Sequence, residues 1–177
     1  MNFLSAAECQ VQVGRLGSTA QNLAAGVRPA HFKKAADFFY ESRLANAPQV
    51  AKELIDGLGN FETCLLWTHG LVWGDRTQEG DPPLDWAQYG LWRESCGAPS
   101  ALYHSPGQVF VASEKAELAR GIEFTIYTGS DALVFPSPTP CFVHLSHDDL
   151  ISVQSRTNLT RLSAGLEKLG LRRAAMK

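Results

Sequence analysis

The sequence lacks the features that mark secreted, membrane-spanning or zinc-stabilised proteins. Its four cysteines are widely spaced and form no CxxC pair, so we expect reduced thiols, without a disulfide framework or a zinc ribbon. No stretch reaches the about 18 consecutive apolar residues that a transmembrane helix needs. Residues 1–5 carry no basic segment ahead of a long apolar run, so no secretory signal is expected. These absences predict a cytoplasmic protein that does not enter membranes.

The motifs of several large enzyme classes are missing as well. The GxSxG nucleophile elbow, the GxGxxG dinucleotide loop, the GxxxxGK[ST] phosphate loop and the HExxH zinc motif do not occur. We therefore expect no cofactor and assign no catalytic residue. Asp and Glu number 18 against 16 Lys and Arg, and this near balance argues against nucleic acid as the main partner.

What is present is the composition of an ordinary globular protein, with 45% hydrophobic and 19% charged residues. A chain of 177 residues is long enough to bury a core without disulfides or metal ions, which predicts one domain over residues 1–177. The fold class then depends on how the hydrophobic period changes along the chain.

Helical periods dominate the first third of the chain. The capping-box pattern Ser5–Glu8 predicts a helix of about 18 residues, because its two side chains satisfy free backbone N–H groups at a helix start. After Pro29, apolar side chains recur at helical spacing over 32–40 and predict a second helix. The segment 46–59 predicts a third helix.

Strand periods dominate the remainder. Residues 62–73 are apolar on both faces, which is typical of a central strand, and strict alternation over 122–127 predicts another strand. The segment 85–94 fits a short helix or, nearly as well, a strand. Further strands are predicted at 101–104, 108–112, 132–135, 141–146 and 150–153, with a short helix at 114–120.

The chain ends in a predicted amphipathic helix whose leucines would cover one face of the sheet. These leucines are Leu159, Leu162, Leu166 and Leu169. The sequence therefore predicts an α+β fold, with a helical N-terminal third packed on an antiparallel sheet and a C-terminal amphipathic helix.

Tryptophan and acidic residues concentrate in the middle of the chain. All four tryptophans fall within the 26 residues 67–92, and residues 53–94 hold eight acidic side chains against two basic ones. Trp67 and Trp73 lie on the predicted central strand and are assigned to the core, whereas the later pair follows an exposed acidic loop. The predicted partner-binding residues are Asp75, Glu79, Asp81, Asp85, Trp86 and Trp92.

A second polar group, Cys141-x2-His144-x2-His147-Asp148, combines side chains that transition metals prefer as ligands. Along an extended strand Cys141 and His147 share one face and His144 points to the other, so we expect no metal site. The alternative hypothesis is a small hydrolase or metal-dependent enzyme centred on His144, His147 and Asp148.

The C-terminal strands resemble those of small bacterial toxin-immunity proteins, over the stretches Ser130–Phe135 and Phe142–Val153. The resemblance implies a non-catalytic α+β domain that binds a toxin and blocks it by surface complementarity. Nuclease toxins have basic clefts, which an acidic surface complements. The leading hypothesis is a protein-binding module of the immunity or inhibitor type, with a basic toxin domain as candidate partner. Binding of a small molecule in an aromatic pocket is a third hypothesis.

Overall fold

The computed structural model describes residues 1–15, 18–24, 29, 32–40, 46–70, 84–138, 141–156 and 158–174. Within these residues, eight strands form one antiparallel sheet in the order β1-β4-β3-β5-β6-β7-β2-β8. The strands are β1 (Asn2–Leu4), β2 (Lys34–Phe39), β3 (Thr63–Gly70), β4 (Gly107–Val111), β5 (Asp131–Ser137), β6 (Cys141–Ser146), β7 (Leu150–Ser155) and β8 (Arg172–Arg173). The α-helices are α1 (Ala6–Gly14), α2 (Ala20–Ala24), α3 (Ala47–Leu58), α4 (Leu84–Ser95), α5 (Lys115–Thr128) and α6 (Thr160–Lys168). The predicted α+β class is confirmed, with helices interleaved between strands.

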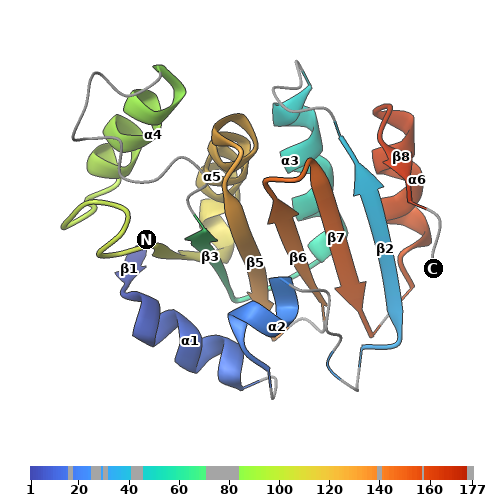
Figure 1. Cartoon of the computed structure of the whole chain (residues 1–177), viewed down its shortest axis with the longest axis horizontal. Coiled ribbons are helices and arrows are strands. Elements are labelled where there is room, and N and C mark those ends of the chain that lie inside the picture. The colour runs from blue at the N-terminus through green and yellow to red at the C-terminus, as the bar shows by residue number, and fades with distance from the viewer. Residues whose placement is uncertain are drawn as a thin grey trace.

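Helices cover both faces of the sheet (Figure 1). Helices α3, α5 and α6 pack on one face, called here the three-helix face, and α1 and α2 pack on the other, the two-helix face. Strand β3 has apolar side chains on both faces of the sheet. Cys64 and Leu66 belong to the core on the three-helix face, and Leu65 and Trp67 belong to the core on the two-helix face. The prediction of a central strand is confirmed over 63–70, and residues 71–73 lie outside the described residues.

The predicted helix over 32–40 is wrong, because residues 34–39 form strand β2. Phe38 is fully buried while its neighbour Phe39 is 43% exposed, which is the alternation of a strand. The apolar residues of this segment fit both periods, and pairing with β7 along the whole length of β2 decides between them. The N-terminal third is therefore not uniformly helical.

The predicted strand over 122–127 is also wrong, because helix α5 continues through Gly121. Buried apolar side chains recur every four residues along this helix. They are Leu118, Ile122 and Ile126, each at most 1% exposed. Gly121 permits a close approach to the sheet, since a Cβ there would lie 2.7 Å from a methyl group of Leu66. The helix ends instead at Gly129, whose φ of 59° is the left-handed conformation that favours glycine.

The other predicted elements have mixed outcomes. The capping box at Ser5 is confirmed, but α1 ends at Gly14 and is shorter than expected. The segment 101–104 is not a strand and lies in coil and turn. The structure confirms the helix predicted at 46–59, the strands at 108–112, 132–135, 141–146 and 150–153, and the C-terminal helix. Of the two alternatives for 85–94, the structure shows the helix. No described helix has the length and apolar character needed to cross a lipid bilayer.

Helices α3 and α6 approach each other through two glycines. A Cβ on Gly57 of α3 would lie 2.6 Å from Leu162 of α6, and a Cβ on Gly165 of α6 would overlap the Glu53 side chain. Leu162 and Leu166 are 4% and 0% exposed, so the leucine stripe of α6 is buried against the three-helix face, as predicted.

The sheet is bordered by two very short strands. Strand β1 has three residues and strand β8 has two, Arg172 and Arg173, both of them exposed. Strand β8 pairs with Phe38 and Phe39 and so covers the outer end of β2.

Shortening a leucine of α6 should cost far more stability than removing a charge from β8. We expect Leu166→Ala to lower the free energy of unfolding by about 2–5 kcal/mol, because it leaves a cavity in a closed core. Arg173→Ala should change it by less than about 0.5 kcal/mol, since that side chain is exposed. Urea unfolding followed by circular dichroism measures both. Equal losses of stability in the two variants would contradict the finding that Leu166 is buried and Arg173 is exposed.

Candidate functional site

The structure places the two predicted partner-binding tryptophans on α4, at the outer end of the molecule (Figure 1). Trp86 and Trp92 are both half-buried. Asp85 lies in the first turn of α4, and its side chain is outside the described residues. The remaining predicted residues, Asp75, Glu79 and Asp81, also lie outside them. Their role in partner binding stays a prediction.

An aromatic stack holds α4 against α5. The ring of Tyr89, which is 1% exposed, stacks on Phe124 with centroids 5.4 Å apart and on Trp92 at 5.8 Å. The indole N–H of Trp92 donates a hydrogen bond of 2.9 Å to Glu117 of α5. This packing fixes the position of α4 against α5. The side of α4 that faces away from α5 is therefore held in place.

A pocket of about 350 Å³ lies between α4 and the segment 98–102, and we call it the α4 pocket. Trp86 and Tyr89 supply aromatic walls, and Arg93 also lines the pocket. Trp86 therefore borders a concavity, which is the setting in which a tryptophan contributes most to binding.

Arg93 is the least expected residue of this site. It is only 3% exposed, and its Nη2 donates to the backbone carbonyl of Ser105 at 2.7 Å. Its guanidinium lies 5.3 Å from the ring centre of Phe3 and 5.9 Å from that of Tyr89. Its Nη1 is buried and has no hydrogen-bond partner, and no described carboxylate forms an ion pair with it. Burial lowers the pKa of this guanidinium, against the opposing effect of the neighbouring Tyr89 hydroxyl.

Sequence reasoning missed Arg93 as a site residue and counted it only as a basic residue in an acidic segment. The available signal was its spacing of four from Tyr89, which puts both side chains on one face of a helix. The burial of that face depends on Phe3 and Ser105, which are distant in the sequence.

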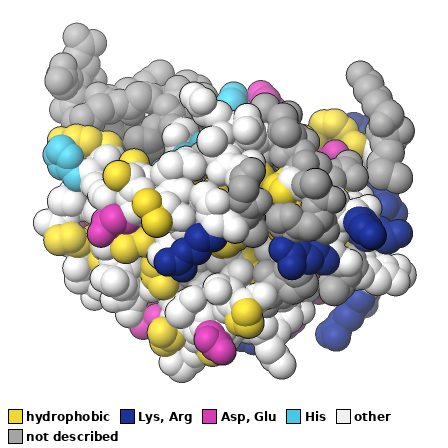
Figure 2. Space-filling view, turned by 90° about the horizontal axis from the view of Figure 1, so that it is seen from below, with side chains coloured by type: hydrophobic (Ala, Val, Ile, Leu, Met, Phe, Trp, Pro, Cys, Tyr) yellow, Lys and Arg dark blue, Asp and Glu magenta, His cyan; other side chains and the backbone are white. Residues whose placement is uncertain are grey.

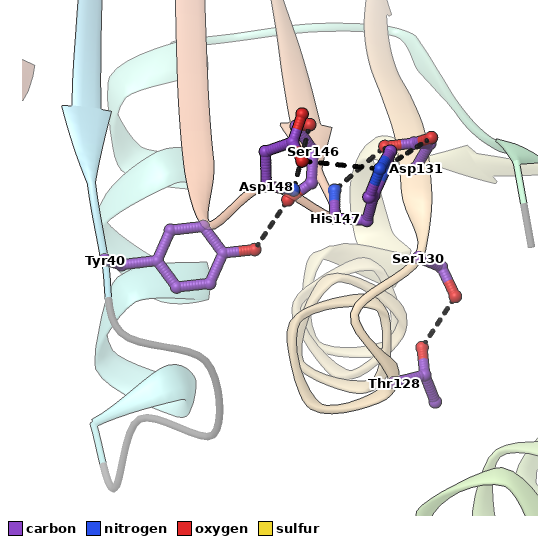
Figure 3. Close-up of polar contacts among 7 residues, drawn as sticks. All are labelled: Tyr40, Thr128, Ser130, Asp131, Ser146, His147 and Asp148. Carbon is purple, nitrogen blue, oxygen red and sulfur yellow. Dashed lines mark hydrogen bonds and ion pairs between the residues drawn. The ribbon is translucent and has the colours of Figure 1, made fainter. Parts of the chain in front are cut away.

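The residues of the enzyme hypothesis, Cys141 to Asp148, have three different surroundings. Cys141 faces the three-helix core, whereas His144 lies on the opposite face, where its ring stacks on His69 with centroids 5.5 Å apart. The predicted separation of Cys141 and His144 is therefore confirmed. His147 lies in the turn after β6, and its Nδ1 is 2.9 Å from the carboxylate of Asp131, as Figure 3 shows.

Asp131 and the turn form one polar network (Figure 3). Asp131 also accepts a hydrogen bond of 2.9 Å from the backbone N–H of His147. The second ring nitrogen of His147 lies 3.4 Å from Asp148, which is largely exposed. The hydroxyl of Tyr40 donates to the backbone carbonyl of Ser146 at 3.4 Å. Each ring nitrogen of His147 thus lies close to a carboxylate, that of Asp131 or that of Asp148. These two contacts account for the position of the His147 side chain.

The stacked histidines are uncharged at neutral pH. Burial, followed by the neighbouring His69, lowers the pKa of His144 to about 4. Burial also lowers the pKa of His69, against the opposing effect of Asp131. The Nε2 atoms of both rings are buried without a hydrogen-bond partner. Among the residues that the structure describes, no group of three or more His, Cys, Asp or Glu side chains could hold a metal ion.

The cysteines do not offer an activated nucleophile. Burial raises the pKa of Cys9 to about 12 and that of Cys141 to about 11, and it also raises the pKa values of Cys64 and Cys96. A thiolate is the reactive form, so these four thiols are poorly suited to nucleophilic chemistry at neutral pH.

Acid should weaken the fold through His144. Its imidazole has a pKa of about 4 in the folded protein and 6.5 as an ordinary histidine. Between these values the unfolded chain binds more protons, so this contribution to stability is complete above about pH 6.5 and is lost as the pH falls towards 4. His147 acts in the opposite sense, because its hydrogen bond to Asp131 raises its pKa.

A comparison of variants isolates the contribution of His144. We expect His144→Gln to flatten the fall in unfolding free energy between about pH 7 and pH 4.5, measured by urea unfolding. The same substitution at the exposed His104 serves as control and should leave the slope unchanged. A slope that His144→Gln does not alter would show that another group controls the acid response.

Comparison with protein-family models, with curated proteins and with solved structures finds no match for this chain, so its site is interpreted from its own geometry.

Proposed function

We propose that this protein binds another protein through the α4 surface, which consists of the α4 pocket with Trp86 and of the exposed Leu91 on the same helix, and that it acts as an inhibitor of the immunity type. The observation that supports this most strongly is the α4 pocket, a concavity of about 350 Å³ that Trp86 and Tyr89 line.

One large apolar side chain of α4 is exposed among polar ones, which are Gln88, Glu94 and Ser95. Leu91 is 66% exposed and points away from the stack on α5. Leu91 does not line the α4 pocket, but an exposed leucine surrounded by polar residues is typical of an interface, and it lies on the same helix as the pocket. Of the acidic residues predicted to steer a basic partner, Asp75, Glu79 and Asp81 precede this helix in the sequence and Asp85 lies in its first turn.

The resemblance of the C-terminal strands to toxin-immunity proteins supports the inhibitory role, and the four unpaired cysteines agree with a cytoplasmic location. The hydrolase hypothesis has weaker support. His147 is held between Asp131 and Asp148, and His144 faces a different set of side chains.

A photo-crosslinking residue at position 91 should capture a protein partner in the source cells, whereas the same residue at position 11 should not. The two sites are matched, because Leu91 and Val11 are 66% and 63% exposed and lie on separate helices. Mass spectrometry of the crosslinked band identifies the partner. Equal capture from both positions, or capture from Val11 alone, would contradict the proposed surface.

The captured partner allows steering and anchoring to be separated by surface-binding kinetics. Reversing Asp81 and Asp85 to Lys should lower the association rate, and more so at low salt, because exposed charges act over about 8–10 Å at physiological ionic strength. Trp86→Ala should instead raise the dissociation rate, with a loss of about 2 kcal/mol or more if it is a central anchor. Melting temperatures should stay nearly constant. Unchanged kinetics in the combined variant would refute the assignment of these residues.

A further inference from the structure

A second pocket lies on the two-helix face, at the end of the molecule away from α4. We call it the α1 pocket; its volume is about 220 Å³, and it lies between α1 and the ends of β3 and β5. Figure 2 looks onto this end of the molecule, where Lys and Arg side chains lie next to exposed hydrophobic ones. Neither the proposed partner-binding surface nor the histidine group contributes to it.

The lining of the α1 pocket divides into an apolar part and a cationic part. Leu65, Val109 and Phe135 supply apolar side chains from three adjacent strands, and Phe32 adds an aromatic one. The cationic part comes from Arg15, at the end of α1, and from Arg156, which follows β7. No acidic side chain is among the described lining residues.

Packing holds one of the two arginines in position. The guanidinium of Arg156 lies over the ring of Phe32, 5.6 Å from its centre. Phe32 is 3% exposed, and its ring packs edge-on against Phe142, so the support under the guanidinium is itself fixed. A guanidinium stacked on a ring keeps its in-plane N–H groups free to donate to a planar acceptor.

Neither arginine is neutralised within the described part of the chain. Arg15 and Arg156 are both exposed, and no described carboxylate lies within ion-pair distance of either. Two cations beside an apolar concavity without acidic residues form a site that favours anions with an apolar body.

We propose that the α1 pocket binds a small organic acid whose aromatic or branched aliphatic group occupies the apolar part and whose carboxylate pairs with Arg156 and Arg15. A carboxylate fits because its two oxygens match the paired donors of a guanidinium. The size restricts the body of the ligand, since sites for drug-sized molecules measure about 300–1,000 Å³ and this pocket is smaller. The α1 pocket shares no lining residue with the α4 pocket, so this proposal does not depend on the proposed partner binding.

Titration of the isotope-labelled full chain with 3-phenylpropionate, followed by NMR, tests the proposal. The acid should shift the backbone amide signals of Thr63, Leu65 and Ser137 saturably and leave that of Leu91 on α4 unchanged. Two further probes separate the contributions: 3-phenylpropionamide keeps the body without the charge, and acetate keeps the charge without the body. Each should bind at least about tenfold more weakly than the acid.

Variants of the arginine identify the site. Arg156→Gln should weaken binding of 3-phenylpropionate at least about tenfold, and Arg156→Lys should give an intermediate loss because it keeps the charge but not the paired donors. Arg161→Gln is the matched control, since it removes an exposed arginine from α6 on the other face of the sheet. A thermal melt of each variant verifies that the fold is retained.

Three results would overturn the proposal. They are the absence of saturable shifts at the α1 pocket, equal affinity for the acid and its amide, and equal binding by Arg156→Gln and wild type. None of them bears on the crosslinking experiment at position 91, so failure here is distinguishable from failure of the partner-binding proposal.

Discussion

Strands β3, β5 and β6 present apolar side chains to both faces of the sheet, and the need to cover both faces determines where the helices lie. Leu66, Val134 and Val143 face one core, whereas Trp67, Leu133 and Phe142 face the other. Burial of apolar surface is the dominant stabilising term, so a sheet of this kind cannot leave one side in water. Helices α3, α5 and α6 meet this need on one side, and α1 and α2 meet it on the other. Helix α4 lies outside this double layer, which leaves it available for other contacts.

Local sequence was sufficient wherever one hydrophobic period fitted and others did not. The strand at 141–146 and the helix at 46–59 were predictable for this reason. Residues 122–127 satisfy alternation and helical spacing at once, and the contact of α5 with the sheet decides between them. The segment 34–39 has the same ambiguity, which pairing with β7 resolves.

The candidate sites were harder to predict than the elements that carry them. The ring of His69 meets that of His144 because of the register of β3, β5 and β6, and Asp131 meets His147 across the same strands. Arg93 becomes a buried cation only because Phe3 and Ser105 pack around it. These groupings arise from chain segments far apart in the sequence, and no pattern within a single segment reveals them. Trp86 could be named from the sequence alone because it lies beside an acidic loop, and its role in partner binding stays a prediction.

The short border strands have a consequence for how the protein behaves at high concentration. An exposed strand edge is a row of free backbone donors and acceptors to which another chain can add. Strand β8 pairs with Phe38 and Phe39 of β2, and its two residues are both arginines, whose like charges repel a second copy. Removing Arg172 and Arg173 would free the backbone groups of Phe38 and of the exposed Phe39 that pair with β8. We therefore expect loss of β8 to make the edge of β2 more open to pairing with a strand of a second copy.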